Sequence, residues 1–335
     1  MPDSAGTASA FLSGVKANYR TLGVNGKVTD QERDCDLINK NSVKTIMNWA
    51  QEVGKATGIV TTTRITHATP ASSYAHVAHR WWENDVSLKN ASVKGLCKDI
   101  ARQLVEDEPG SKFNVILGGG RKNMLPKESP DLKFGERKGL REDGLNLIKI
   151  WSEAKKGKNL QHVYVNSTKG LKSIPYDQID YAMGLFSYDH LSYDSVRDKS
   201  DQGQPSLSEM TEAAINVVKK YPNGFVLLIE GGLIDWAHHD NKAAISLQEV
   251  LEFEQAIQKS LEMTSSDETM IVVTADHSHG FTINGYGPRN QSIFGLSDHQ
   301  EIVGEEEIPF TTLLYATGPG NNRPRKDPRK QSICE

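Results

Sequence analysis

Acidic and histidine side chains follow an apolar run near residue 230, in a pattern that suits metal binding. Residues 225–229 lead to Glu230, and Asp235 and His239 come shortly after. Because side chains four positions apart lie on the same face of a helix, Asp235 and His239 are spaced to bind one ion. The pattern also fits an exposed helix start, with the acidic group near the helix dipole and an ordinary surface histidine.

A second acidic and histidine group follows the apolar residues 270–275. Asp276, His277 and His279 lie within the segment DHSHG. At the end of a strand the chain leaves the pleat, so adjacent Asp and His side chains can face one cation. His279 is either a further ligand or a residue that orients a neighbouring carboxylate. The alternative interpretation is a polar turn after a strand.

Oxygen and guanidinium groups follow a third strand-like run, at residues 57–67. This run ends in His67, and Thr69 and Arg80 follow it. A threonine hydroxyl beside a carboxylate is a hard donor that suits magnesium. The planar guanidinium of Arg80 matches phosphate oxygens. Alone, each of these residue types is usually an ordinary surface residue.

Ser4 precedes a helix-like segment, residues 5–18. We expect Ser4 to be the N-cap of this helix, where backbone N–H groups and the helix dipole favour an anion. Mixed Asp and His ligands suit zinc, whereas Glu230 and Thr69 suit magnesium, so the groups together predict two zinc ions and one magnesium ion. Paired metals clamp a phosphoryl group, and zinc would help to ionise Ser4 as a nucleophile.

Alternating strand and helix patterns indicate how these residues are positioned. Predicted strands cover residues 57–67, 113–120, 162–167, 223–232, 269–279 and 310–318. Predicted helices cover residues 42–56, 92–107, 144–156, 206–221 and 246–263, with Ser206 and Glu209 forming a capping box. The alternation predicts an α/β fold with a mostly parallel sheet and helices on both faces. Such sheets bind ligands at the carboxyl ends of their strands.

Composition bounds the class of protein. The 335 residues are 37% hydrophobic and 24% charged, with a net charge of -4, which gives no reason to expect nucleic acid as a partner. No signal or transmembrane segment is expected from the sequence. Three sequons, at Asn90, Asn166 and Asn290, would suit a secreted protein. We expect one domain over residues 1–320 and a disordered, Pro-rich basic tail over residues 321–335.

Long segments of the chain resemble animal alkaline phosphatases of the membrane-bound type. The similar segments are PDSAGTA, TTTRITHATPASSYAHVAHR, IEGGLIDWAHHD, VTADHSHGF, NVILGGGRKNMLP and SIFGLSD. They occur in the family's order and extend to about residue 320. The resemblance therefore implies the alkaline phosphatase fold and a hydrolase that acts on phosphate monoesters.

The resemblance also implies a role for each candidate residue. Ser4 matches the nucleophile that becomes phosphoserine, and Arg80 matches the phosphate-binding arginine. The implied ligands are Asp235 and His239 for the first zinc, Asp276, His277 and Ser4 for the second, and Glu230 and Thr69 for magnesium. His279 and His67 match residues near the metals that support the ligands. Cys35 and Cys97 fall where the family has a disulfide, which leaves Cys334 as the odd thiol.

The chain also departs from the family pattern. The family's Asp-Gly-Met strand and its His-x-Gly-x-Asp segment do not occur, so we expect a chain truncated at both ends. The vertebrate calcium site is in doubt, because Ser187 and Gln204 stand where acidic ligands are expected. Asp189 or Asp201 would have to compensate.

Two hypotheses follow for the activity of the chain. The first hypothesis is an alkaline phosphatase whose complete form is an extracellular or cell-surface homodimer. A lipid anchor would be present only in the full-length protein. This chain alone would be weakly active or inactive. The second is a non-catalytic product that binds metal or phosphate weakly. The chain itself carries no recognisable signal or anchor.

Overall fold

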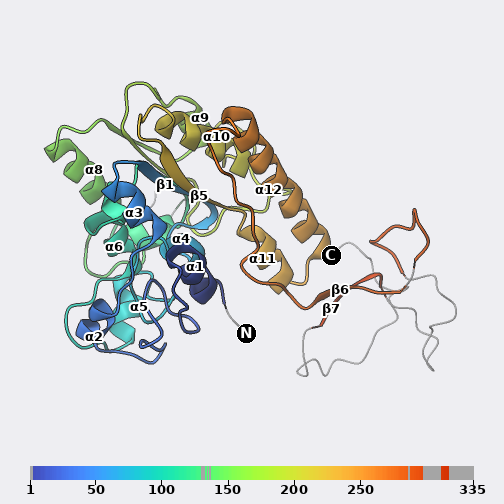
Figure 1. The fold of residues 1–335 in the computed structure, drawn as a ribbon, viewed down its shortest axis with the longest axis horizontal. Helices are drawn as coiled ribbons and strands as arrows, with labels where there is room; N and C mark the ends of the chain where they lie inside the picture. Colours follow the sequence, from blue (N-terminus) through green and yellow to red (C-terminus); the bar gives the residue numbers. More distant parts are fainter. Residues whose placement is uncertain are drawn as a thin grey trace. The chain divides into compact units, whose positions relative to one another are not determined.

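Figure 1 shows a computed structural model of the chain, which describes residues 3–129, 133, 135, 137–285, 287–296 and 311–316. The chain divides into two compact units. Unit 1 comprises Met1–Leu233 and Glu249–His277, and unit 2 comprises Ile234–Gln248 and Ser278–Glu335.

A five-stranded sheet forms the centre of unit 1. Its strands lie in the order β3-β4-β2-β1-β5, and every neighbouring pair is parallel. The strands are β1 (Ala56–Arg64), β2 (Val115–Gly119), β3 (His162–Val165), β4 (Tyr181–Leu185) and β5 (Phe225–Glu230). The prediction of a mostly parallel sheet is confirmed, and β4 is a strand that the sequence patterns did not indicate.

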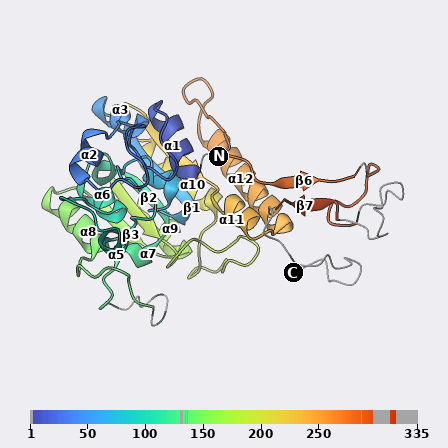
Figure 2. The ribbon, with the colours of Figure 1, turned by 90° about the horizontal axis from the view of Figure 1, so that it is seen from below.

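Helices cover both faces of this sheet. Helix α10 packs against β1, β2 and β5, and α3 contacts β1 and β5. Figure 1 shows α9 and α10 on one side of the strands and α3, α4 and α6 on the other. Figure 2 shows α3, α6, α9 and α10 from below. The helices confined to unit 1 are α1 (Ser4–Ser13), α2 (Cys35–Lys40), α3 (Ile46–Glu52), α4 (Ala68–Ala71), α5 (Asp85–Asn90), α6 (Ile100–Glu106), α7 (Arg121–Met124), α8 (Leu147–Gly157), α9 (Thr168–Lys172), α10 (Leu207–Val218) and the short 3-10 helix Gly110–Lys112.

Strand β1 is buried along almost its whole length. Only Arg64, at its end, is partly exposed. The strand combines apolar residues with three consecutive threonines, and β-branched side chains of this kind pack well on a pleated surface. Because a parallel strand in the middle of a sheet is covered on both faces, its sequence shows no clean polar alternation.

Local sequence signals set the ends of several helices. Helix α10 begins with the predicted capping box, in which the Ser206 hydroxyl accepts from the Glu209 backbone and the Glu209 carboxylate accepts from the Ser206 backbone. The helix predicted over residues 92–107 is wrong at its start, since α6 begins at Ile100. Gly95 has a left-handed φ of 83°, and Asp99 caps α6 by accepting from the backbone of Arg102.

The strand predicted over residues 269–279 does not form. Among the described residues β5 is one of the two edge strands of the sheet, and residues 269–275 have no strand pairing. Their apolar side chains are consequently exposed, including Met270 at 87% and Val272 at 73%. An extended apolar segment needs a hydrogen-bonded neighbour to become a strand, and the sequence pattern alone does not reveal whether one is present.

Unit 2 contains a small antiparallel pair of strands. These are β6 (Phe281–Ile283) and β7 (Leu313–Tyr315), and β7 falls within the strand predicted over residues 310–318. Two helices include residues of both units. Helix α11 (Leu233–His239) has its first residue in unit 1 and the others in unit 2. Helix α12 (Ala243–Met263) belongs to unit 2 up to Gln248 and to unit 1 from Glu249.

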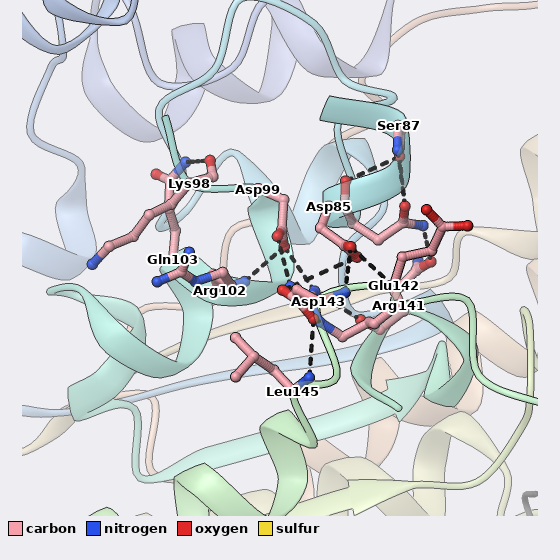
Figure 3. Close-up of polar contacts among 12 residues, drawn as sticks. Asp85, Ser87, Lys98, Asp99, Arg102, Gln103, Arg141, Glu142, Asp143 and Leu145 are labelled. Atoms are coloured by element: carbon pink, nitrogen blue, oxygen red, sulfur yellow. Dashed lines mark hydrogen bonds and ion pairs between the residues drawn. The ribbon is translucent and has the colours of Figure 1, made fainter. Parts of the chain in front are cut away.

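A buried ion-pair network joins a loop to α6, as Figure 3 shows. Arg141 is fully buried and donates to both carboxylate oxygens of Asp99, at 3.1 and 2.9 Å. Arg141 also pairs with Asp143, and the Asp85 carboxylate accepts from the backbone of Glu142 at 2.9 Å. A buried charge is costly without a partner, so the network fixes the path of the loop relative to α5 and α6.

The predicted disulfide is confirmed. Cys35 and Cys97 are bonded, with their Cα atoms 5.3 Å apart. Cys334 and the tail predicted over residues 321–335 lie outside the described residues. None of the helices in the described part of the chain is long and apolar enough to span a membrane.

Candidate active site and metal ligands

Ser4 is the first residue of α1 rather than its N-cap. Asp3 has extended backbone geometry and caps the helix, its Oδ1 accepting from the Gly6 backbone at 3.2 Å. The prediction that Ser4 is the N-cap is therefore wrong by one position, because Asp and Ser are both strong capping residues and they are adjacent here. Ser4 is buried, with 5% of its surface exposed.

Asp3 links the start of α1 to Arg80. Its Oδ2 accepts from Arg80 Nη1 at 2.9 Å, and its Oδ1 also accepts from the Arg20 backbone at 3.0 Å. Burial alone would raise the pKa of Asp3, but the hydrogen bonds from Arg20 and Arg80 bring that pKa below its usual value. Asp3 therefore remains a carboxylate that orients Arg80, a role that the sequence analysis did not assign.

The predicted nucleophile and a predicted zinc ligand come together in unit 1. Ser4 Oγ lies 3.2 Å from His277 Nε2, although 273 positions separate the two residues. His277 Nε2 also lies 3.5 Å from Asp276 Oδ2, and its backbone N–H donates to Asp276 Oδ1 at 3.0 Å. The DHSHG segment thus presents both an imidazole and a carboxylate beside the start of α1.

Glu230 ends β5 among hydroxyl groups. Thr61 Oγ1 donates to Glu230 Oε2 at 2.5 Å, and Thr63 Oγ1 donates to the same oxygen at 3.1 Å. Removal from solvent raises the pKa of Glu230, the hydroxyls of Thr61 and Thr69 oppose that rise, and the negative charge of Asp276 adds to it.

Thr61 and Thr63 contact a candidate ligand, and the sequence patterns did not indicate them. The available signal was their spacing, since residues two apart in a strand face the same way, and Thr61 is paired in register with Glu230.

The predicted supporting histidine His67 contacts the predicted phosphate-binding residue. His67 precedes α4, which carries the buried Thr69. Its Nε2 lies 3.1 Å from Arg80 Nη2, and its ring meets the ring of His190 edge-on, with the centroids 5.2 Å apart. Arg80 is consequently held from two sides, by Asp3 and by His67.

Unit 2 brings together the remaining candidates. Asp235 Oδ1 lies 3.4 Å from His239 Nε2 and 2.6 Å from His279 Nε2. The rings of His239 and His279 meet edge-on with their centroids 4.9 Å apart. Asp235 and His239 face each other on α11, as their spacing of four residues predicts. His279 contacts the same Asp235 carboxylate.

The donor atoms within each unit suit the metals that the sequence predicts. In unit 1, the Asp276 charge raises the pKa of Glu230, a repulsion that a cation would relieve, and the threonine hydroxyls add hard oxygen donors. In unit 2, one carboxylate oxygen faces two imidazoles, the mixed oxygen and nitrogen set that zinc accepts.

Asp189, a candidate compensating ligand for calcium, already pairs with two cationic side chains. Asp189 Oδ1 accepts from Arg64 Nη1 at 2.7 Å, and Lys122 pairs with the same carboxylate. The pKa of Asp189 is lowered by these two cations against the effect of burial. The two nearby positive charges disfavour a calcium ion at this carboxylate.

Comparison with known proteins places this arrangement in a family. A family model described as alkaline phosphatase matches residues 1–332. The chain belongs to the alkaline phosphatase family. It is 45% identical over 323 residues to the tissue-nonspecific alkaline phosphatase isozyme of Felis catus, covering 96% of this chain and 60% of that protein.

Further members of the alkaline phosphatase family are similar in sequence and in fold. The membrane-bound alkaline phosphatase of Bombyx mori is 42% identical over 321 residues, which cover 96% of this chain and 57% of that protein. The solved structure of a cold-active alkaline phosphatase from Shewanella superposes with a TM-score of 0.61 at 28% identity, covering 86% of this chain and 57% of that one. The chain thus spans about 60% of the length of the curated relatives.

Proposed function

We propose that this chain hydrolyses phosphate monoesters with Ser4 as the nucleophile. The observation that supports this most is the 3.2 Å approach of Ser4 Oγ to His277 Nε2 at the start of α1. A helix start favours an anion, and Arg80 is held beside it by Asp3. The family supports phosphate monoesters as the substrate class.

The reaction proceeds in two balanced displacements. Ser4 Oγ loses its proton and attacks phosphorus, forming a new P–O bond as the bond to the substrate's alcohol oxygen breaks. The departing oxygen takes up a proton, which gives phosphoserine and the free alcohol. Water then attacks the same phosphorus, the bond to Ser4 Oγ breaks, and inorganic phosphate leaves as the serine recovers its proton. Arg80 holds two phosphate oxygens through both steps, because its guanidinium presents paired donors.

Three metal ions belong to the proposal. Asp235 and His239 would hold one zinc, Asp276, His277 and Ser4 a second, and Glu230 with Thr69 a magnesium ion. When bound, such ions lower the pKa of coordinated oxygen and neutralise the charge of the phosphoryl group. His279 would support the first zinc site through its contact with Asp235, and His67 would support phosphate binding through its contact with Arg80.

We further propose that the rate of this chain alone is low. The residues just before Asp276 form no strand, so Asp276 and His277 lack the rigid base that a strand gives a catalytic site. A chain that binds metal or phosphate without turnover is the second candidate, which the exposure of Met270 and Val272 favours.

Export from the cell is part of the same proposal. The Cys35–Cys97 disulfide suits an oxidising compartment, and the sequon residue Asn90 is exposed. A homodimer, a lipid anchor and a single domain over residues 1–320 rest on the resemblance to the family.

Detection of phosphoserine tests the function even at a low rate. The native chain, supplied with zinc and magnesium, is mixed with p-nitrophenyl phosphate, quenched in acid and analysed by peptide mass spectrometry. We expect phosphate on Ser4, none in Ser4→Ala, and unchanged labelling in Ser13→Ala, which alters a buried serine at the other end of α1. Release of p-nitrophenol above the protein-free blank, at equal rates for Ser4→Ala and the native chain, would refute the role of Ser4. Phosphate binding without labelling would establish the non-catalytic alternative.

A further inference from the structure

An arginine next to the candidate site has an unusual backbone conformation. Arg20 has a φ of 64°, in the left-handed region that residues other than glycine rarely adopt. Its N–H donates to Asp3 Oδ1 at 3.0 Å and its carbonyl accepts from the Arg80 backbone at 2.8 Å. These two bonds hold Arg20 between the residue that caps α1 and the residue that would bind phosphate. Strained backbone that is fixed in this way is common at functional sites.

The side chain of Arg20 is fixed by two exposed aromatic rings. Its guanidinium lies 4.7 Å from the Tyr19 ring centroid and 4.9 Å from that of Trp81. Tyr19 is 51% exposed and Trp81 is 60% exposed, and Trp81 directly follows Arg80. A cation between two rings keeps its charge while losing conformational freedom before any ligand arrives.

Arginines outnumber carboxylates among the charges that act on His79, one of which is Arg20. Burial lowers the pKa of His79, and the charges of Arg20, Arg33 and Arg80 lower it further, while Asp30 opposes them. Asp30 approaches Arg20 only to 3.9 Å. One third of the Arg20 side chain is exposed, so its charge remains available to a ligand.

We propose that Arg20 binds a second anionic group on the substrate, so that the site favours phosphate monoesters whose leaving group carries its own negative charge. The inference rests on the proposed function, because Arg80 must bind the phosphoryl group for Arg20 to meet the leaving group. Arg20 is then a specificity residue, with Tyr19 and Trp81 holding its guanidinium in place.

Binding of two non-hydrolysable phosphonates tests the inference without relying on turnover. Para-carboxyphenylphosphonate carries one carboxylate group, and so one negative charge, that phenylphosphonate lacks. Each phosphonate is titrated calorimetrically into the chain in the presence of zinc and magnesium, at mildly alkaline pH and low salt. The titrations give the ratio of the affinities for the two phosphonates. We expect the native chain to prefer the carboxylate by about three- to fivefold, the scale of a partly exposed ion pair.

Two variants of Arg20 separate the role of its side chain from that of its backbone, and a variant of Arg102 is the control. Arg20→Asn removes the charge and tolerates left-handed φ, so we expect the affinity ratio to fall to about one. Arg20→Lys retains the charge without the planar stacking, and we expect an intermediate ratio. Arg102→Gln removes an arginine that pairs with Glu106 on α6, and it should leave the ratio as in the native chain.

Each outcome has a distinct meaning. A loss of affinity for both phosphonates in Arg20→Asn, with an unchanged ratio, would mean that Arg20 acts only through its backbone and would overturn the inference. A native ratio near one would overturn it as well, while leaving the proposed function intact. Failure of the native chain to bind either phosphonate would refute the proposed function, and the inference with it.

Discussion

Asp3 performs two tasks with one carboxylate, capping α1 and orienting Arg80. Sequence alone identifies Ser4 and Arg80 as candidates, since their residue types suit nucleophilic attack and phosphate binding. It does not separate Asp3 from Ser4 as the cap, because both types accept hydrogen bonds from a helix start. Thr61 and Thr63 were missed for a related reason, since β-branched residues in a buried strand look like packing residues.

The charge of Asp3 should stabilise the fold in a pH-dependent way. Its pKa is lower in the folded chain than in the unfolded one, so the stabilisation is present above the unfolded value of 3.8 and is lost as the pH falls through the folded value. Asp3→Asn keeps a capping oxygen but removes the charge. We expect it to lower the free energy of unfolding by about 1–2 kcal/mol at neutral pH and by much less in acid.

Urea unfolding of both chains across this pH range measures the effect. Asp34→Asn, at the cap of α2, is the matched control, because that carboxylate caps a helix without an arginine partner in the contacts described. A difference between Asp3→Asn and the native chain that does not change with pH would contradict the assignment.

Element ends and element pairings differ in how well sequence predicts them. The capping box of α10 and the apolar runs of β1 and β5 depend on nearby residues, and the sequence shows both. The start of α6 depends on Gly95 and on the disulfide of Cys97, so the continuous helical pattern from residue 92 was misleading.

The disulfide should contribute strongly to the stability of unit 1. It joins the first residue of α2 to the segment before α6, across a sequence separation of 62 residues. In the loop-closure model such a bond stabilises by up to about 4 kcal/mol by constraining the unfolded chain. Replacing Cys35 and Cys97 together by serine should therefore lower the urea midpoint markedly, whereas Cys334→Ser should not. Equal midpoints for the double variant and the native chain would contradict this expectation.

Glu249 on α12 should make unit 1 less stable as the pH rises. Glu249 Oε1 accepts a hydrogen bond from the Asp194 backbone N–H at 2.7 Å. Burial, and to a smaller extent the negative charge of Asp194, raise the pKa of Glu249 from 4.5 to about 7. Between the unfolded pKa of 4.5 and the folded pKa of about 7, the folded chain holds a proton that the unfolded chain has released. The free energy of unfolding therefore falls as the pH rises through this range and then levels off. The total loss is about 3 kcal/mol at most.

Thermal unfolding of Glu249→Gln tests this slope, because glutamine can still accept the hydrogen bond but does not titrate. We expect the decline between the two pH values to be reduced in this variant and retained in Glu254→Gln, an exposed position on the same helix. An undiminished decline in Glu249→Gln would assign the titration to another group.

On the scale of the whole molecule, each unit described by itself contains candidate ligand groups from distant parts of the sequence. Unit 1 contains Ser4, Glu230 and His277, and unit 2 contains Asp235 and His279. The parallel sheet was predictable because alternating strands and helices permit few arrangements. Whether residues 269–275 form a strand could not be predicted in the same way, because a strand requires a hydrogen-bonded neighbour that the local sequence does not specify.

Metal ions should stabilise the folded chain if the candidate ligands bind them. An ion that binds only the folded state adds about 2.7 kcal/mol at a hundredfold excess over its dissociation constant. We therefore expect the unfolding midpoint to rise with added zinc and to fall on chelation, with a smaller rise in Asp276→Asn. A midpoint independent of zinc concentration would contradict the proposed ligands.

The exposed segment before Asp276 also bears on solubility. Met270, Val272 and Val273 form a β-prone apolar run whose backbone has no strand partner in the part of the chain that the structure describes. A run of this kind can join one chain to another. Asp267 and Glu268 precede the run and act as charged gatekeepers. Salt screens their repulsion, so light scattering by concentrated chain should increase with ionic strength, and Val272→Lys should suppress that increase more than Val250→Lys on α12. The run that would support a metal ligand is thus also a segment prone to aggregation.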